Sequence, residues 1–298
     1  MTPYIPAVAA IHDLSGFGRN SLSVVIPILS AMGVQAVALP TALLSTHTGG
    51  FEGYAFMDLT AFMKEAIDHW LRLDLKFQGI YSGFLGSPAQ VDLVAAMINQ
   101  QKAGKPLVVV DPVMADDGKL YETMDMDMVA GMRRLIGGAG VVTPNLTEAA
   151  LLLGEEYRRD ISEEALKEWL TRLADMGPET VVITSAPLSR KGKDTSVVAY
   201  SHQNRHFWRV PCVYIPANYP GTGDVFTSVL TGSLLQGDSL PVALDRSVQF
   251  VAQAIRASYG FDYPRRNGVL LERVLAGLGG PVSSGSYEWL DEREDSAW

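Results

Sequence analysis

The sequence predicts an α/β fold in which helices cover both faces of a central, mostly parallel sheet. Short apolar runs alternate with helical segments along the first two thirds of the chain, and each apolar run ends in a polar turn. This alternation is typical of a doubly wound sheet, whose strands are buried on both faces. The polar residues that could carry chemistry follow the apolar runs, and open α/β sheets bind their ligands at that edge.

Strands are expected where apolar and β-branched residues run together between turn residues, and helices where apolar residues recur every three or four positions. Glycine or a polar turn follows the segments and sets their ends. The strands expected on this basis are 7–11, 34–39, 79–81, 107–110, 141–142 and 181–183. The helices expected between and after them are 21–32, 58–71, 88–102, 124–136, 148–153 and 163–176.

The last third of the sequence predicts a hairpin, a helical region and a tail. Residues 196–200 and 207–214 flank a polar loop and are expected to form an antiparallel hairpin at the edge of the sheet. Helices are expected over 224–236, 241–258 and 268–278. We expect one domain over residues 1–280, followed by a loosely held, polar and acidic tail over residues 281–298.

Composition and charge exclude several classes of protein. The 298 residues are 47% hydrophobic, which is enough to bury a large core. The net charge of −9 and the lack of a Lys/Arg cluster disfavour nucleic acid as a partner. The lone Cys212 rules out an internal disulfide and a Cys-rich metal site. No signal peptide or membrane span is recognisable, so we expect a cytoplasmic protein without a membrane partner.

The strongest local motif is a glycine-rich turn, Gly221-Thr222-Gly223-Asp224, at the expected start of a helix. Glycines let the backbone approach a phosphate closely, and a helix N-terminus offers free N–H groups and a favourable dipole. Asp224 could then take the proton of a substrate hydroxyl as a general base. By spacing alone, an ordinary helix N-cap explains the motif equally well.

Three further polar groups follow expected strands. Asp111 comes directly after the strand 107–110 and could hold Mg²⁺ or form an Asp-Pro turn. Asn145 and Glu148 are three residues apart at a helix start, which suits water-mediated metal and phosphate contacts or a capping box. His47 lies among hydroxyl residues and could contact an aromatic ligand or belong to a hydrogen-bonded surface loop.

Several common nucleotide and metal motifs are missing from the sequence. No GxxxxGK[ST], complete GxGxxG, HExxH, CxxC or GxSxG pattern occurs. This disfavours a P-loop nucleoside triphosphatase and a classical dinucleotide-binding enzyme. Residues 115–121 form either a mobile lid over a ligand or a polar turn.

Taken in order, the motif segments match the pattern of one family. They are 12–18, 39–51, 81–87, 110–121, 143–148 and 221–226. Together they resemble the ribokinase-like superfamily and, within it, the pyridoxal/pyridoxamine kinases, over roughly residues 9–278. The resemblance implies a three-layer α/β/α fold, ATP as phosphoryl donor, Mg²⁺ and a homodimer. It also implies phosphorylation of the 5′-hydroxymethyl group of pyridoxal, pyridoxine or pyridoxamine.

The resemblance also implies a role for individual residues. Asp224 would be the base, and the amides of Gly221, Thr222 and Gly223 would form the anion hole. Asp111 and Glu148 would bind the metal ion. Residues implied to contact the nucleotide or its triphosphate are Asn145, Glu148, Thr184 and Ser185. Residues implied to bind the acceptor are Asp13, Ser15, Thr41, His47 and Tyr81.

Other functions remain open at the level of the sequence. A hydroxymethylpyrimidine kinase of thiamine synthesis would share the Ser-Gly turn after the first strand and the 221–224 loop, and the stretch 45–48 favours vitamin B6 over it. A sugar kinase is disfavoured because residues 216–220 lack the Asp-Thr pair typical of that group. A non-catalytic vitamer-binding protein would be expected to lose one of Asp224, Asp111 and Glu148.

Some relatives carry cysteine where Asp224 stands and use it on the aldehyde of pyridoxal. Because this chain has Asp there and Cys212 lies well upstream, we expect no covalent substrate adduct. The preferred vitamer, the need for a monovalent cation, and the choice between salvage and biosynthesis are not set by the sequence.

Overall fold

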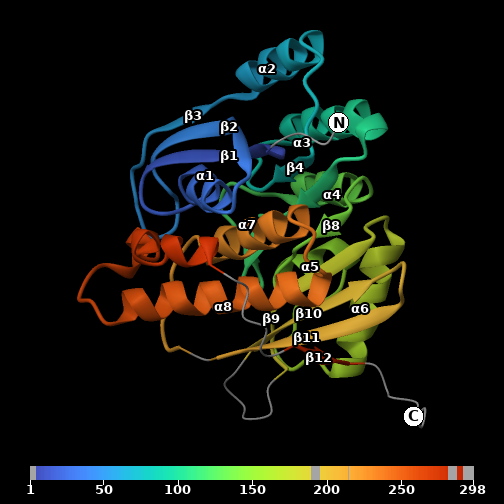
Figure 1. Ribbon diagram of the computed structural model, residues 1–298, viewed down its shortest axis with the longest axis vertical. Helices are drawn as coiled ribbons and strands as arrows, with labels where there is room; N and C mark the ends of the chain where they lie inside the picture. Colours follow the sequence, from blue (N-terminus) through green and yellow to red (C-terminus); the bar gives the residue numbers. More distant parts are fainter. Residues whose placement is uncertain (1–4, 189–194, 214, 281–286, 291–298) are drawn as a thin grey trace.

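The computed structural model describes residues 5–188, 195–213, 215–280 and 287–290. A ten-stranded sheet runs through the molecule in the order β12-β11-β10-β9-β8-β5-β4-β1-β2-β3 (Figure 1). Its strands are β1 Ala7–Phe17, β2 Gln35–Thr46, β3 Phe56–Asp58, β4 Gly79–Ser82, β5 Leu107–Val110, β8 Val141–Val142, β9 Thr180–Ala186, β10 Thr195–Ser201, β11 His206–Cys212 and β12 Glu288–Trp289. A separate hairpin consists of β6 Ala115–Asp116 and β7 Lys119–Leu120.

The helices form a layer on each face of the sheet. Helices α1 Leu22–Ala31, α7 Thr222–Leu235 and α8 Leu240–Tyr259 pack on one face. Helices α2 Thr60–Arg72, α3 Pro88–Gln101, α4 Met126–Ile136, α5 Leu146–Leu153 and α6 Glu163–Asp175 pack on the other. The prediction of a three-layer α/β/α fold with a mostly parallel sheet is therefore confirmed.

The centre of the sheet is parallel and both of its edges are antiparallel. Strands β2, β1, β4, β5, β8 and β9 pair in parallel. Strand β3 on one side and strands β10 to β12 on the other pair antiparallel. The chain passes from β1 to β2 on one side and later returns to β4 on the other side of β1. This reversal creates a crevice at the carboxyl ends of β1 and β4, where doubly wound sheets bind ligands.

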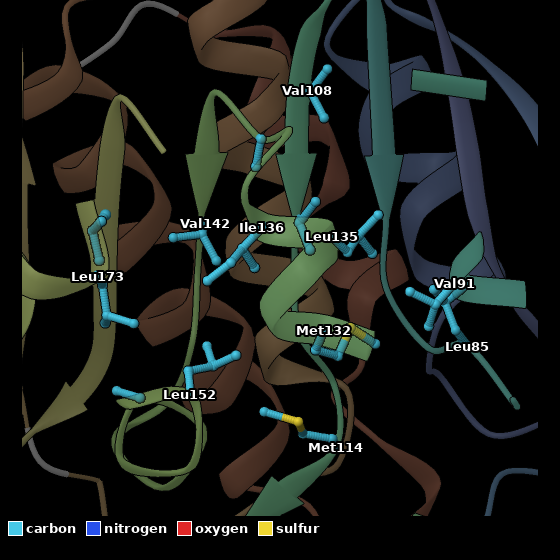
Figure 2. Packing of buried hydrophobic residues seen from close by; sticks show 14 of the residues in the cluster. Leu85, Val91, Val108, Met114, Met132, Leu135, Ile136, Val142, Leu152 and Leu173 are labelled. Carbon is cyan, nitrogen blue, oxygen red and sulfur yellow. The ribbon is translucent and has the colours of Figure 1, made fainter. Parts of the chain in front are cut away.

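Alternate residues of each central strand pack into opposite layers, as the pleat of a strand requires. Val108 and Val110 of β5 belong to the core beneath α2 to α6, whereas Val109 belongs to the core beneath α1, α7 and α8. Figure 2 shows α4 placing Leu135 and Ile136 close to the sheet. Because both faces are covered, the central strands are mostly apolar, whereas the extended end of β1 carries His12, Asp13 and Ser15.

Several strands are longer than the sequence predicts, and β1 and β2 differ most. β1 continues to Phe17 through a segment expected to be a turn, and β2 continues past Pro40 to Thr46. A register shift lies between the pairs His12↔Pro40 and Leu14↔Leu43, so that one residue of β1 opposes two of β2. Such a bulge accommodates a proline within a strand and changes the direction of nearby side chains.

The expected helix 268–278 is wrong. The chain forms the 3₁₀ turns η3 Leu271–Arg273 and η4 Leu275–Gly279 there, preceded by η2 Arg265–Asn267. Glycines at 268, 277 and 279 disfavour a continuous helix, while Leu271 and Leu278 are buried against the α1 and α8 side of the core.

The C-terminal tail and the end of the predicted hairpin fall partly outside the described residues. Residue 214 and residues 281–286 and 291–298 lie outside the described residues. Glu288–Trp289 forms β12, which pairs with β11 and was not predicted. None of the helices in the described chain combines the length and apolar character needed to cross a bilayer.

Candidate active site

A cavity of about 710 Å³ opens at the carboxyl edge of the central strands. Its wall combines the ends of β1, β5 and β8 with the loop 47–54 and the N-terminus of α7. Most of the residues singled out in the sequence meet there although they lie far apart along the chain. These wall residues are Asp13, His47, Asp111, Asn145, Glu148, Thr184, Gly221, Gly223 and Asp224.

The N-terminus of α7 supplies the phosphate-binding geometry. Gly221 is the N-cap in a left-handed conformation, with φ of +83°, and a Cβ there would lie 2.3 Å from the carbonyl oxygen of Arg19. Only glycine fits this position. A Cβ at Gly223 would meet no atom within 4 Å, so the backbone is open toward the cavity at that point. The N–H groups of the first helical turn have no intrahelical acceptors and can receive an anion. Thr222 is not among the wall residues, and its hydroxyl donates to the Tyr219 carbonyl oxygen at 3.1 Å.

Asp224 lies in the first turn of α7 and is only 8% exposed. The backbone N–H of Ser21 donates to its Oδ2 at 3.0 Å. Burial raises the pKa of Asp224 to about 7, an effect that the Ser21 hydrogen bond opposes and the charge of Asp13 reinforces. A carboxylate with a pKa near neutrality is suited to accept a proton at physiological pH.

Ser21 is a site residue that the sequence reasoning missed. Its φ of 50° is unusual for a residue other than glycine, and such strain often accompanies a functional role. In this conformation its N–H reaches Asp224 while its hydroxyl donates to Oδ1 of Asp13. Ser21 thus links the two carboxylates. The only sequence signal was its place at the start of a helix.

Asp13 is held by hydroxyl groups on both oxygens. Ser15 donates to Oδ2 at 2.9 Å, and Ser21 donates to Oδ1. Burial raises the pKa of Asp13, while the two hydroxyls and His47 act in the opposite direction. Ser15 is therefore a support for Asp13 behind the cavity wall.

His47 is fixed by the backbone through both ring nitrogens. Nε2 lies 2.6 Å from the carbonyl oxygen of Arg266, and the N–H of Gly49 donates to Nδ1 at 3.1 Å. A carbonyl only accepts and an amide only donates, so Nε2 carries the proton and the ring is neutral. Burial lowers the pKa of His47. His47 itself is buried and contributes to the cavity wall, whereas residues 48–50 beside it are exposed.

Aromatic contacts hold the loop 47–54 in place at the cavity wall. Phe51 meets His47 edge to face at 5.0 Å, and the guanidinium of Arg266 lies 4.8 Å from the centre of the Phe51 ring. Phe51 and Arg266 were not singled out in the sequence.

Asn145 and Glu148 form the capping box that the sequence allowed. The Asn145 side chain accepts from the Glu148 N–H at 2.9 Å, and Glu148 Oε2 accepts from the Asn145 N–H at 2.8 Å. Glu148 Oε1 accepts from the N–H of Met114 at 3.1 Å. Burial and the charge of Asp111 nevertheless raise the pKa of Glu148 well above its usual value. The capping role and a place in the cavity wall are thus compatible.

Asp111 is held by a threonine that the sequence did not single out. Thr227 Oγ1 donates to Asp111 Oδ2 at 3.2 Å and lies 3.1 Å from Thr143 Oγ1. Burial raises the pKa of Asp111 to about 8, and the charge of Asp224 adds to the effect. Thr227 is three residues after Asp224, so one turn of α7 brings both to the same end of the cavity.

The cavity wall is strongly acidic. Its carboxylates are Asp13, Glu52, Asp111, Glu122, Glu148 and Asp224, and the wall as described contains no Lys or Arg. A polyphosphate would need cations to enter such a site. No group of three His, Cys, Asp or Glu side chains among the described residues could hold a metal ion by itself. The oxygen donors present fit Mg²⁺, which commonly takes one or two carboxylates and completes its shell with water and phosphate.

The remaining predicted site residues lie around the cavity rather than in the described part of its wall. Thr41 Oγ1 donates to the Phe84 carbonyl oxygen at 2.9 Å. Tyr81 is fully buried with its ring against His12, at 4.3 Å between centres. Ser185 has a φ of 58° and follows Thr184, which does line the cavity.

Comparison with known proteins adds a family model and close relatives. The sequence model of the family described as phosphomethylpyrimidine kinase matches residues 26–268. The pyridoxine/pyridoxal/pyridoxamine kinase of Bordetella avium is 31% identical over 269 residues, which cover 85% of this chain and 86% of that one.

Solved structures agree with this result. A candidate phosphomethylpyrimidine kinase from Bacteroides thetaiotaomicron, in an orthorhombic crystal form with pyridoxal, is 52% identical with a TM-score of 0.92, covering 96% of this chain and 100% of that one. The pyridoxal kinase of Lactobacillus plantarum is 33% identical with a TM-score of 0.83, covering 92% and 96%.

Proposed function

We propose that this chain, a kinase that belongs to the phosphomethylpyrimidine kinase family, phosphorylates the 5′-hydroxymethyl group of a vitamin B6 vitamer with ATP. The observation that carries the proposal is the buried Asp224, with a pKa near 7, beside the open N-terminus of α7. The Bordetella kinase and the crystal form with pyridoxal support a pyridine acceptor.

Asp224 would act as the general base. Its Oδ2 is held by the N–H of Ser21, which leaves Oδ1 to accept the proton of the acceptor hydroxyl. As that O–H bond breaks, the oxygen attacks the γ-phosphorus of ATP, and the bond from phosphorus to the leaving ADP oxygen breaks. The first-turn amides of α7, at Gly221, Thr222 and Gly223, would stabilise the charge on the transferred phosphoryl group.

Asp111 and Glu148 would hold Mg²⁺ near Asp224, whose charge acts on Asp111. The bound ion would neutralise charge on the phosphate oxygens in a wall that is otherwise acidic. Thr227 would keep the Asp111 carboxylate in place through its hydroxyl. Asn145, Thr184 and Ser185 would contribute to the nucleotide end.

The acceptor ring would lie between Asp13 and the loop 47–54. Because both nitrogens of His47 bond to the backbone, His47 would pack its ring against the acceptor and not hydrogen-bond to it. Asp13 would receive a polar substituent of the ring. Ser15 would hold the Asp13 carboxylate, and Thr41 would hold the backbone carbonyl of Phe84, each through its hydroxyl. The buried ring of Tyr81 would support the pocket from behind its wall.

Hydroxymethylpyrimidine is the second candidate acceptor. The family description and the Bacteroides relative both refer to a phosphomethylpyrimidine kinase. The pyrimidine also carries a hydroxymethyl group on a nitrogen heterocycle, so the chemistry at Asp224 would be the same. A vitamer-binding protein without activity is the third possibility, and it differs by showing no turnover.

The test measures ADP release with ATP·Mg²⁺ and four acceptors in parallel: pyridoxal, pyridoxamine, pyridoxine and hydroxymethylpyrimidine. Asp224→Asn should abolish the turnover. Asp127→Asn is the matched control, because Asp127 lies in the first turn of α4 and is exposed. ADP release with hydroxymethylpyrimidine alone would assign the protein to thiamine synthesis. No ADP release with any of the four acceptors would favour the vitamer-binding protein without activity.

A further inference from the structure

His12 on β1 is fully buried and has no role in the proposed reaction so far. Neither ring nitrogen has a hydrogen-bond partner among the residues that the structure describes. Its Nδ1 lies 3.9 Å from Oδ1 of Asp224, and its ring meets Tyr81 at an interplanar angle of 79°. The β-bulge of β2 lies opposite Asp13, the residue that follows His12 on β1.

An unpaired imidazole in this place lowers the stability of the fold. A neutral histidine always carries one N–H, and a buried N–H without an acceptor is unfavourable. The chain also leaves room for the ring, because a Cβ at Gly83 would lie 2.2 Å from His12 Nδ1. An apolar side chain would fill the site without this cost. A polar ring at this position therefore calls for a reason other than packing.

The surroundings of Asp224 give that reason. The titratable groups that face it are His12, Asp13, Asp111, Tyr81 and Tyr121. The two other carboxylates oppose its charged form, and the phenols of Tyr81 and Tyr121 carry no positive charge. Burial lowers the pKa of His12 to about 3, so this ring is neutral and acts through its N–H dipole.

We propose that His12 is a positioning residue for Asp224. Its Nδ1–H would point at Oδ1 while the Ser21 N–H holds Oδ2, so that the two donors fix the carboxylate plane and favour its charged form. At 3.9 Å the contact is a charge–dipole interaction, longer than a hydrogen bond. Oδ1 keeps a second lone pair for the acceptor hydroxyl. The proposal rests on the proposed role of Asp224 as the base.

The first test compares two His12 variants in the kinase assay with pyridoxal and ATP·Mg²⁺ between pH 6 and 9. His12→Phe keeps the ring contact with Tyr81 and removes the N–H, whereas His12→Asn places an amide N–H near the position of Nδ1. His12→Phe should lower kcat about tenfold or more, change KM little and move the acid limb to higher pH. His12→Asn should recover part of the loss.

Stability separates this role from a structural one. His12→Phe removes an unpaired polar group, so its Tm should equal or exceed that of the wild type. Ser82→Ala is the control, because it too removes a buried polar group without a partner in the described chain, here a hydroxyl, and should leave the pH profile unchanged. An unchanged kcat and acid limb in His12→Phe would overturn the proposal.

The second test needs no turnover. Tm is measured at pH 8 for the wild type, His12→Phe, Asp224→Asn and the double variant. If the ring favours the charged carboxylate, Asp224→Asn should raise Tm more in the His12→Phe background than in the wild type. Additive changes in Tm would contradict the proposal. Because this cycle is independent of the acceptor, it decides the role of His12 even if the wild type phosphorylates none of the four compounds.

Discussion

Asp224→Asn should make the protein more stable while removing its activity. The pKa of Asp224 rises from 3.8 to about 7 in the folded protein, because burial disfavours the charged form. The two values differ by about three pH units, and each unit corresponds to about 1.36 kcal/mol. Holding the carboxylate charged in the fold therefore costs about 4 kcal/mol. The asparagine variant cannot ionise, and its amide oxygen can still accept from Ser21.

The sign of the effect depends on pH. Below about pH 4 the carboxyl is protonated in both the folded and the unfolded state, so its ionisation contributes nothing. Between about pH 4 and pH 7 the unfolded chain loses the proton and the folded protein keeps it, which favours unfolding. Above about pH 7 the carboxyl is charged in both the folded and the unfolded state, so the full cost of burying its charge lowers the stability. The gain from Asp224→Asn should thus grow across this window and then level off.

Urea unfolding at pH 4, 6 and 8 measures the gain directly. The variant should exceed the wild type by about 4 kcal/mol at pH 8 and by little at pH 4. The exposed control Asp127→Asn should show no such pH dependence. A difference that is the same at pH 4 and pH 8, or an asparagine variant that is less stable than the wild type at pH 8, would refute the reasoning.

Three further results are expected. Gly221→Ala should cost at least about 1 kcal/mol of stability and most of the activity, because its Cβ would clash with the Arg19 carbonyl oxygen, as urea unfolding and ADP release would reveal. Thr227→Val should raise the Mg²⁺ concentration needed for half-maximal rate, whereas Thr227→Ser, which keeps the hydroxyl on Asp111, should not; equal Mg²⁺ curves would contradict this. The value of kcat/KM should rise with pH through about pH 7, since Asp224 must be charged to act, and a flat profile would speak against it.

The sequence predicted the layers of the fold well and the ends of its strands poorly. Burial on both faces makes the central strands mostly apolar, and this pattern is visible locally. The continuation of β2 through Pro40 depends on a bulge against β1, which only the paired strands reveal. The same limit applied to residues 268–278, where burial of Leu271 and Leu278 is compatible with short 3₁₀ turns as well as with a helix.

The site could be predicted where its residues follow strand ends. Asp111 and Glu148 fall at strand ends or helix starts, and parallel topology brings such positions to one edge. Ser21, Thr227 and His12 could not be found in this way, because their roles come from a strained backbone angle and from contacts across elements. Dimerisation and the single-domain boundary at residue 280 stay predictions.

The most direct test of the account is the identity of the product formed from pyridoxine, which has hydroxymethyl groups at both the 4′ and the 5′ position. Pyridoxine and ATP·Mg²⁺ are incubated with the wild type, Asp224→Asn or Asp127→Asn, and the phosphorylated position is read by ³¹P and ¹H NMR. The account predicts the 5′-phosphate from the wild type and from Asp127→Asn, and no phosphate ester from Asp224→Asn. A phosphate at another position, or full turnover by Asp224→Asn, would contradict it.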